Sequence, residues 1–318
     1  MDPDVAALLQ EESIATPRES FPELVARLSQ LSVTKHYDAY ADVPWDDPAS
    51  RIEVEDPVWQ LGPDHPLGVS AWYAEQRPEV RARIGLHFVA CAMQTGAEFE
   101  NVLTRGLLNF AVSLPKGAPE FRYAYHEAIE ESQHTLMFNE FVNRCGLDPG
   151  RAPFMMRAGW GPVIRLAKSF PELFFLFVLG GEDPIDYVQR MMLRSGRAVH
   201  PLLKRVMQIH VTEEARHLCF ARAYLRARVP ELAPVRRRIL SIAAPLALGS
   251  VARRMLNPPP AVVRTYKIPR TVVARDYRRS PIQRERMRDA LSKARTLCAE
   301  LDLLTPAAGR IWRAMGIA

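Results

Sequence analysis

The stretch Glu131-Ser132-Gln133-His134 has a counterpart further along the chain, Glu214-Ala215-Arg216-His217. Both stretches have the form Glu-x-x-His, and both lie among apolar residues at the three- and four-residue spacing of a helix. Residues three apart share one face of a helix, so each motif directs a carboxylate and an imidazole to the same side. The two motifs therefore predict two helices whose ligand-type side chains point to a common place.

Two further helices are predicted to supply one acidic residue each. The helical pattern of residues 78–114 has Glu100 within its apolar stripe, and Glu98 on the neighbouring face is the alternative. In a second apolar pattern, residues 171–194, Glu182 directly follows a run of aromatic and aliphatic residues. A buried carboxylate is costly unless a cation or a hydrogen-bond donor meets it. We therefore expect both helices to turn a carboxylate toward the two motifs.

A third histidine lies on the helix of the second motif. His210 precedes Glu214 by one turn and His217 by two, so the three share a face. Two Glu-x-x-His helices with one Glu from each of two others are the ligand pattern of di-iron and di-manganese helical bundles. The candidate metal ligands are Glu100, Glu131, His134, Glu182, His210, Glu214 and His217. Carboxylates and imidazoles without cysteine suit two iron ions, with Fe/Mn or Mn as alternatives.

Other polar residues near the motifs are open to two interpretations. Glu127, Glu130 and Glu213 either hold the outer N–H groups of the imidazoles or Arg216, or they are simply solvated. We expect His87 and His126 to be ordinary core or surface histidines, and Cys91 and Cys219 to be packing thiols.

This ligand order resembles that of the p-aminobenzoate N-oxygenase family of di-iron proteins, in which a third histidine joins the six ligands of the ferritin-like set. The resemblance covers residues 80–230, and His210 matches the additional histidine. It implies a ferritin-like helical core, a homodimer, and activation of O2 with electrons from an external donor. In that family, arylamines are oxidised toward nitro compounds. The resemblance does not identify the substrate of this protein, because no residue of this sequence can be matched to a substrate-contacting residue of the family.

The sequence divides the chain of 318 residues into three parts. Residues 1–75 are rich in proline and tryptophan and predict an irregular arm packed on the core, helical only near Phe21–Leu31. Residues 76–256 form the ferritin-like di-metal domain, with a looser region at 151–168. Residues 257–318 form a basic C-terminal extension, extended at first and helical from Pro281 to Leu303. The predicted fold class is all-α.

Composition limits the location and the partners of the protein. Four dispersed cysteines without a C-x-x-C pair indicate free thiols in a reducing cytoplasm. No signal peptide precedes the first helix, and no apolar run reaches the about 18 residues that span a bilayer, so no transmembrane segment is expected. The net charge of +6 is compatible with an acidic partner, but no nucleic-acid-binding motif is present.

Three functions from different classes follow. The first is a di-iron oxygenase that activates O2 to oxidise a small organic substrate, such as an arylamine in N-oxygenation. The second is a di-iron desaturase or hydroxylase for an acyl or carrier-bound substrate, with the arginines of residues 253–288 docking an acidic carrier protein. The third is a non-enzymatic ferritin-like iron-binding or interaction protein. The two enzyme hypotheses also require a reductase or another electron donor as partner.

Overall fold

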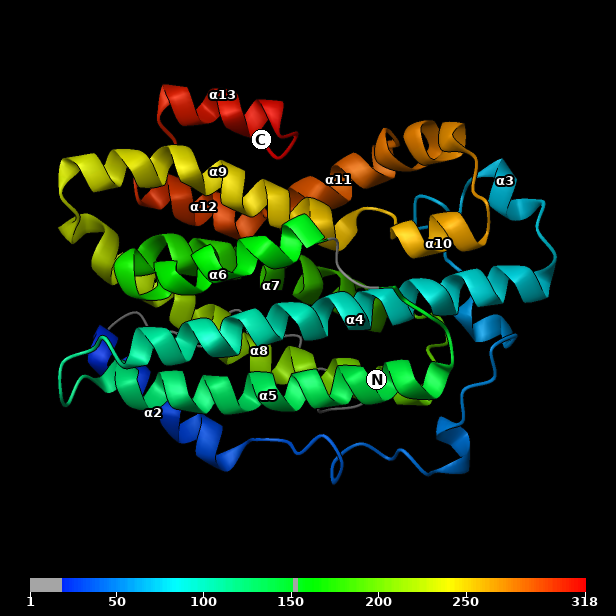
Figure 1. The fold of residues 1–318 in the computed structure, drawn as a ribbon, viewed down its shortest axis with the longest axis horizontal. Helices are drawn as coiled ribbons and strands as arrows, with labels where there is room; N and C mark the ends of the chain where they lie inside the picture. Colours follow the sequence, from blue (N-terminus) through cyan, green and yellow to red (C-terminus); the bar gives the residue numbers. More distant parts are fainter. Residues whose placement is uncertain (1–18, 151–153) are drawn as a thin grey trace.

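The computed structural model describes residues 19–150 and 154–318. Every regular element in this part of the chain is helical, which confirms the all-α prediction (Figure 1). The main helices are α2 (Phe21–Thr34), α3 (Ala71–Ala74), α4 (Pro78–Ala111), α5 (Pro119–Cys145), α6 (Phe154–Ser169), α7 (Pro171–Arg194), α8 (Pro201–Arg228), α9 (Pro234–Leu256), α10 (Pro260–Thr265), α11 (Pro281–Ala290), α12 (Ser292–Glu300) and α13 (Pro306–Ala314). Short 3-10 turns at Pro48–Ser50, Pro57–Trp59 and Val229–Glu231 and a π-helix at Val272–Arg278 complete the set.

Four long helices, α4, α5, α7 and α8, surround the candidate ligands. Each begins with a proline in its first turn, where the missing N–H costs nothing. Figure 1 shows α4 and α5 side by side, with α7 and α8 behind them. The helix α5 ends at Gly146, whose φ of 64° is the left-handed conformation that glycine adopts without strain.

The pair Gly180-Gly181 lets α7 approach its neighbours closely. A Cβ atom at Gly181 would overlap the ring of Phe99 on α4. A Cβ atom at Gly180 would lie 3.1 Å from the Leu248 Cα of α9. The helix α7 continues without interruption through Pro184, although glycine and proline are poor helix formers.

The N-terminal arm runs beneath α5 in Figure 1. The Trp45 side chain is 5% exposed, and its Nε1–H donates to the Ala39 carbonyl at 2.6 Å. Trp59 is also buried, and its ring stacks on His200 with the centroids 4.6 Å apart. The division of the chain at residues 75/76 and 256/257 stays a prediction.

The looser region predicted for residues 151–168 is wrong for the residues that the structure describes. Residues 151–153 lie outside them, and the chain from Phe154 to Ser169 is the helix α6. Gly159, Gly161 and Pro162 are poor helix formers in isolation. Packing of α6 against α4 and α7 overrides that local preference.

The C-terminal extension is more helical than predicted. The short helix α10 and the π-helix occupy the segment that we expected to be extended. The single helix expected from Pro281 to Leu303 is divided between α11 and α12, and α13 follows. Leu291, Leu297 and Trp312 belong to the same hydrophobic core as Phe174 of α7, so burial of apolar area holds the extension on the bundle.

One stretch of the described chain, Pro234–Thr265, is long and apolar enough to cross a membrane by length and composition. Its most apolar window has a mean hydropathy of 1.4, and 44% of that window is buried. We expected no apolar stretch of this length, because the uninterrupted apolar run within it, around Ile239–Gly249, is shorter than a bilayer requires. A core helix passes the same test, and α9 packs against α7 and α13.

Candidate metal centre

The seven residues proposed as ligands all have fully buried side chains, each 0% exposed. Six of them form two overlapping groups in which the ligand atoms lie within 4.8 Å of one another. The first group is Glu100, His134, His210 and Glu214, and the second is Glu131, His134, Glu214 and His217. The structure therefore brings α4, α5 and α8 together at one polar cluster inside an apolar bundle.

Glu214 lies at the middle of this cluster. Its Oε1 atom is 3.0 Å from His217 Nδ1, 3.5 Å from His134 Nδ1 and 3.7 Å from His210 Nε2. Glu131 has a similar position on α5, with Oε1 3.2 Å from His217 Nδ1 and Oε2 3.2 Å from His134 Nδ1. Each of these two carboxylates faces imidazoles from both motif helices, which is the placement of a carboxylate shared between two cations.

Glu100 and Glu182 complete the cluster from α4 and α7. Glu100 Oε1 lies 3.4 Å from His210 Nε2. Glu182 is outside both four-residue groups, but the charges of Glu214 and Glu131 add to burial in raising its pKa well above the usual value. The Glu182 carboxylate therefore faces the other acidic residues of the cluster.

The outer nitrogen of each histidine has a hydrogen-bond partner. His134 Nε2 is 2.9 Å from Glu213 Oε2, and His217 Nε2 is 2.7 Å from Glu130 Oε2. His210 Nδ1 instead meets the amide oxygen of Gln189, at 2.9 Å. These contacts fix the ring orientations and leave His134 Nδ1, His217 Nδ1 and His210 Nε2 facing the cluster.

Arg216 and the N-terminal arm support these outer carboxylates. Arg216 is 3% exposed, and its Nη2 donates to Glu130 Oε1 at 2.8 Å. The backbone N–H of Tyr37 donates to Glu213 Oε1 at 3.1 Å. The structure therefore confirms the expectation that Glu130 and Glu213 hold imidazoles or Arg216. The contributions of Gln189 and Tyr37 were missed, because an amide 21 residues from its histidine and a backbone N–H 176 residues from its carboxylate leave no local pattern.

The electrostatics of the cluster suit a cation. Burial and the neighbouring carboxylates Glu131 and Glu182 raise the pKa of Glu100 well above its usual value. Burial alone would lower the pKa of His134, but hydrogen bonds and charges from Glu131 and Glu213 raise it to about 10. Without a metal, protons must therefore compensate the crowded carboxylates, and metal binding would release them.

Unpartnered oxygen atoms show that the residues fit a metal. Glu100 Oε2, Glu214 Oε2 and both carboxylate oxygens of Glu182 are buried without a hydrogen-bond partner in the described part of the chain. Unpaired buried carboxylate oxygens are costly. Oxygen atoms beside three inward imidazole nitrogens are a donor set that iron and manganese accept.

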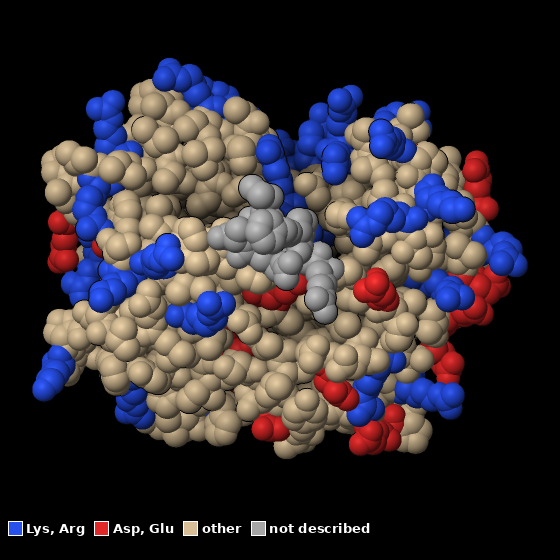
Figure 2. Space-filling model, in the orientation of Figure 1, with Lys and Arg blue, Asp and Glu red and all other residues tan. Residues whose placement is uncertain are grey.

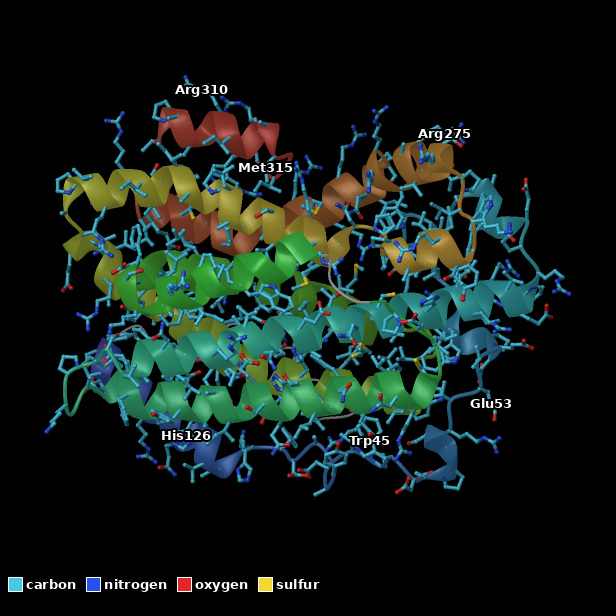
Figure 3. The ribbon with its side chains drawn as sticks, in the orientation of Figure 1. Trp45, Glu53, His126, Arg275, Arg310 and Met315 are labelled. Carbon is cyan, nitrogen blue, oxygen red and sulfur yellow. The ribbon has the colours of Figure 1, made fainter. Side chains whose placement is uncertain are left out.

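The remaining candidates lie outside the cluster. Glu98 accepts from Gln94 Nε2 at 3.2 Å, one turn away on α4. Glu127 is buried without a hydrogen-bond partner, so it is not solvated, and it pairs with neither an imidazole nor Arg216 in the described structure. His87 is a core histidine that contacts the Asp148 carbonyl through Nε2. Figure 3 shows His126 on the outer side of α5.

The two cysteines behave as packing thiols. Cys91 is 3% exposed, and burial raises the pKa of its thiol to about 12. Cys219 is half-buried, and burial raises the pKa of its thiol as well. Neither is among the residues whose ligand atoms form the metal groups.

An apolar cavity of about 240 Å³ reaches the edge of the cluster. Phe138 and Gln189 line it, and both contact His210, with the Phe138 ring 5.1 Å from the imidazole between centroids. Gly96 also lines the cavity and leaves room for the Phe138 ring. A larger hollow of about 710 Å³ is lined by charged residues such as Asp183, Arg190 and Arg222. The apolar cavity is the better site for an organic molecule beside the cluster.

Comparison with known proteins agrees with this geometry. The family model of p-aminobenzoate N-oxygenase AurF matches residues 18–302. An uncharacterized protein of Mycobacterium bovis and one of Mycobacterium tuberculosis are each 40% identical over 295 residues, which is 92% of this chain and 86% of theirs. No solved structure matches the chain significantly.

Proposed function

Because the chain belongs to the p-aminobenzoate N-oxygenase family, a family of ferritin-like di-iron enzymes, we propose that it is a di-iron oxygenase that oxidises a small organic molecule. The observation that carries the proposal is the buried cluster of carboxylates and imidazoles shared by α4, α5, α7 and α8. Its arylamine N-oxygenation, its use of O2 and an external electron donor, and its cytoplasmic location are parts of the same proposal.

The proposed ligands have distinct roles. Glu131 and Glu214 would be shared between two ions, because each faces imidazoles of both motif helices. Glu100 and Glu182 would each add a carboxylate from a separate helix. When bound, two iron ions supply the electrons and the open coordination positions that O2 reduction requires. His210 makes the set richer in nitrogen on the side of Glu100.

The other residues position the ligands and keep water away. Glu130, Glu213 and Gln189 accept hydrogen bonds from the outer imidazole nitrogens and hold the inner nitrogens toward the cluster. Phe138 covers His210, and Leu103 and Phe220 are buried in the surrounding bundle. The apolar cavity beside Phe138 would place the substrate next to the ions and exclude bulk water.

Iron loading of matched variants tests the proposal. The purified protein would be reconstituted with ferrous iron without O2, and bound iron would be measured for each chain. We expect two ions in the natural chain and fewer in Glu100→Ala, with no loss in Glu98→Ala two residues away. O2 consumption should then rise when an arylamine is added.

Two results would count against this function. Equal iron content in Glu100→Ala, Glu214→Ala and the natural chain would remove the proposed site. Stoichiometric iron with no O2 consumption on any amine or acyl substrate would favour the non-enzymatic alternative. Faster O2 consumption with a carrier-bound acyl group than with amines would favour the desaturase or hydroxylase.

A further inference from the structure

The helix α9 is apolar on two opposite sides. One side packs on the bundle, where its residues belong to the hydrophobic core. The other side carries aliphatic side chains that are each between 37% and 71% exposed: Val235, Ile239, Ile242 and Leu246. Their spacing at three and four residues places them in one stripe along the helix, which we call the α9 stripe. Single exposed aliphatic residues are ordinary, but a continuous exposed stripe indicates an interaction site.

The segment before α13 adds to this apolar surface. The Ser241 hydroxyl of α9 donates to the Leu303 carbonyl at 2.9 Å and lies 2.9 Å from the Thr305 hydroxyl. Leu304, between these two partners, is 39% exposed. The segment bonded to α9 therefore presents one more exposed aliphatic side chain.

The sequence around the stripe is basic and has no acidic residue. Between Glu231 and Asp276 the chain contains nine basic residues and neither Asp nor Glu. The nine are Arg236, Arg237, Arg238, Arg253, Arg254, Arg264, Lys267, Arg270 and Arg275. In α9 they stand at positions 236–238 and 253–254, so they flank the stripe at both ends.

Several of the arginines on this side of the molecule have no acidic partner. Arg236 and Arg237 reach acidic residues of neighbouring segments. Arg238, Arg253 and Arg310 are exposed and form no ion pair with the described residues. Figure 3 shows Arg310 at the outer edge of α13, and Figure 2 shows basic side chains along the upper edge of the view, where α9 and α13 lie in Figure 1.

We propose that the α9 stripe and the arginines around it bind the surface of a membrane that contains anionic lipids. The aliphatic side chains would enter the boundary between head groups and acyl chains, and the arginines would pair with lipid phosphates. The helix would lie on the membrane and not cross it, because its opposite side is buried in the protein core. This role is separate from the function of the metal centre.

A lipid surface fits the patch better than a second copy of this chain. In a two-fold dimer the same patch meets itself, so arginines would face arginines with no acidic residue of α9 to offset them. The stripe also lacks the aromatic anchors that dominate protein interfaces. Its side chains line neither of the two cavities described above, so they form an outer surface and not a groove.

Vesicle flotation of the full-length protein tests the proposal. One set of vesicles would contain phosphatidylcholine only, and the other equal parts of phosphatidylcholine and phosphatidylglycerol. We expect about tenfold stronger binding to the anionic vesicles, because several arginines gain lipid phosphates. High salt should weaken this preference, because it screens exposed charges.

Paired variants separate the apolar contribution. Ile239→Gln with Leu246→Gln should weaken binding to anionic vesicles about tenfold, because two aliphatic side chains no longer leave water. Val33→Gln with Val112→Gln is the matched control, since these valines are 44% and 65% exposed in α2 and directly after α4. The control should bind like the natural chain.

A second pair of variants separates the charge contribution. Arg238→Gln with Arg310→Gln should reduce the preference for anionic vesicles. Arg105→Gln with Lys116→Gln lowers the net charge equally at exposed positions in α4 and the turn after it, and should leave the preference unchanged. All these side chains are exposed, so folding should not change, and the thermal midpoint would check this.

Three results would overturn membrane binding by this patch. The first is no binding to either vesicle, or equal binding to both. The second is equal behaviour of each variant pair and its control. The third is a dimeric natural chain that becomes monomeric in Ile239→Gln with Leu246→Gln, as measured by light scattering, because that result would assign the stripe to an interface between copies of the chain.

Discussion

His210 donates a hydrogen bond from Nδ1 to the side-chain oxygen of Gln189, at 2.9 Å. The other two histidines of the cluster are held by carboxylates, so His210 alone among them has a neutral partner. We predict that Gln189→Leu lowers the affinity for one metal ion by about tenfold, because the ring loses its orienting acceptor. Competition with a chelating dye would measure the affinity of each ion.

The variant Gln189→Glu is the matched test of this relationship. A carboxylate at the same place should retain or strengthen metal binding, because it makes His210 resemble His134 and His217. If Gln189→Leu binds both ions as tightly as the natural chain, the contact does not support the metal centre.

The sequence predicted the helices that carry the cluster more accurately than the rest of the chain. The predicted pattern at residues 171–194 coincides with α7, because its apolar face is continuous. The helix α6 was missed, because Gly159, Gly161 and Pro162 oppose a helix locally and only packing against α4 and α7 forms it.

The candidate ligands could be recognised because Glu-x-x-His spacing is local. Glu100 and Glu182 could be recognised because an acidic residue lies within an apolar helical pattern or directly after an apolar run. That signal is also local to one helix. By contrast, the burial of Arg286 could not be predicted from the sequence, because it depends on how α11 packs beside the cavity. Such long-range placements are properties of the folded chain.

Glu130 links two buried groups, and its removal should destabilise the protein. It accepts from Arg216 at 2.8 Å and contacts His217 at 2.7 Å. We predict that Glu130→Ala costs about 3 kcal/mol, because Arg216 stays buried and loses its closest carboxylate. Chemical denaturation of the metal-free protein would measure the change.

The control for this prediction is Glu140→Ala, which removes a partner of Arg144 at the surface of α5, at 2.7 Å. An ion pair in solvent contributes little, so the change should stay below about 1 kcal/mol. Similar losses in the two variants would show that burial does not set the strength of the Glu130 pair.

The predicted homodimer has a candidate surface on α5. Phe121, Tyr125, Ile129 and Leu136 expose between 39% and 60% of their surface and recur along one side of the helix. Figure 2 shows a surface with few charged side chains at the lower left of the view, whereas acidic and basic side chains gather at the lower right. We predict that Ile129→Lys converts a dimer to a monomer, as measured by light scattering.

The helix α9 provides a matched comparison. Val235 is 71% exposed, but arginines at positions 236–238 follow it directly. Val235→Lys should therefore leave the dimer intact. Loss of the dimer in Val235→Lys alone would move the interface to α9, and a monomeric natural chain would contradict the homodimer itself.

Three arginines in the π-helix and directly after it test whether a carrier protein delivers the substrate. Arg278 and Arg279 are exposed, and Figure 3 shows Arg275 at the outer edge of the same segment. Arg275 is 80% exposed at its side chain and pairs with Asp276.

If an acidic carrier docks here, reversing the three charges with Glu should slow turnover of a carrier-bound acyl substrate at least tenfold at low salt and less at high salt. Free arylamines should be oxidised at an unchanged rate, because the three arginines are exposed and none of them lines the apolar cavity or belongs to the metal cluster. Equal slowing of both substrates would indicate damage to the extension, and no slowing of either would exclude docking at this segment.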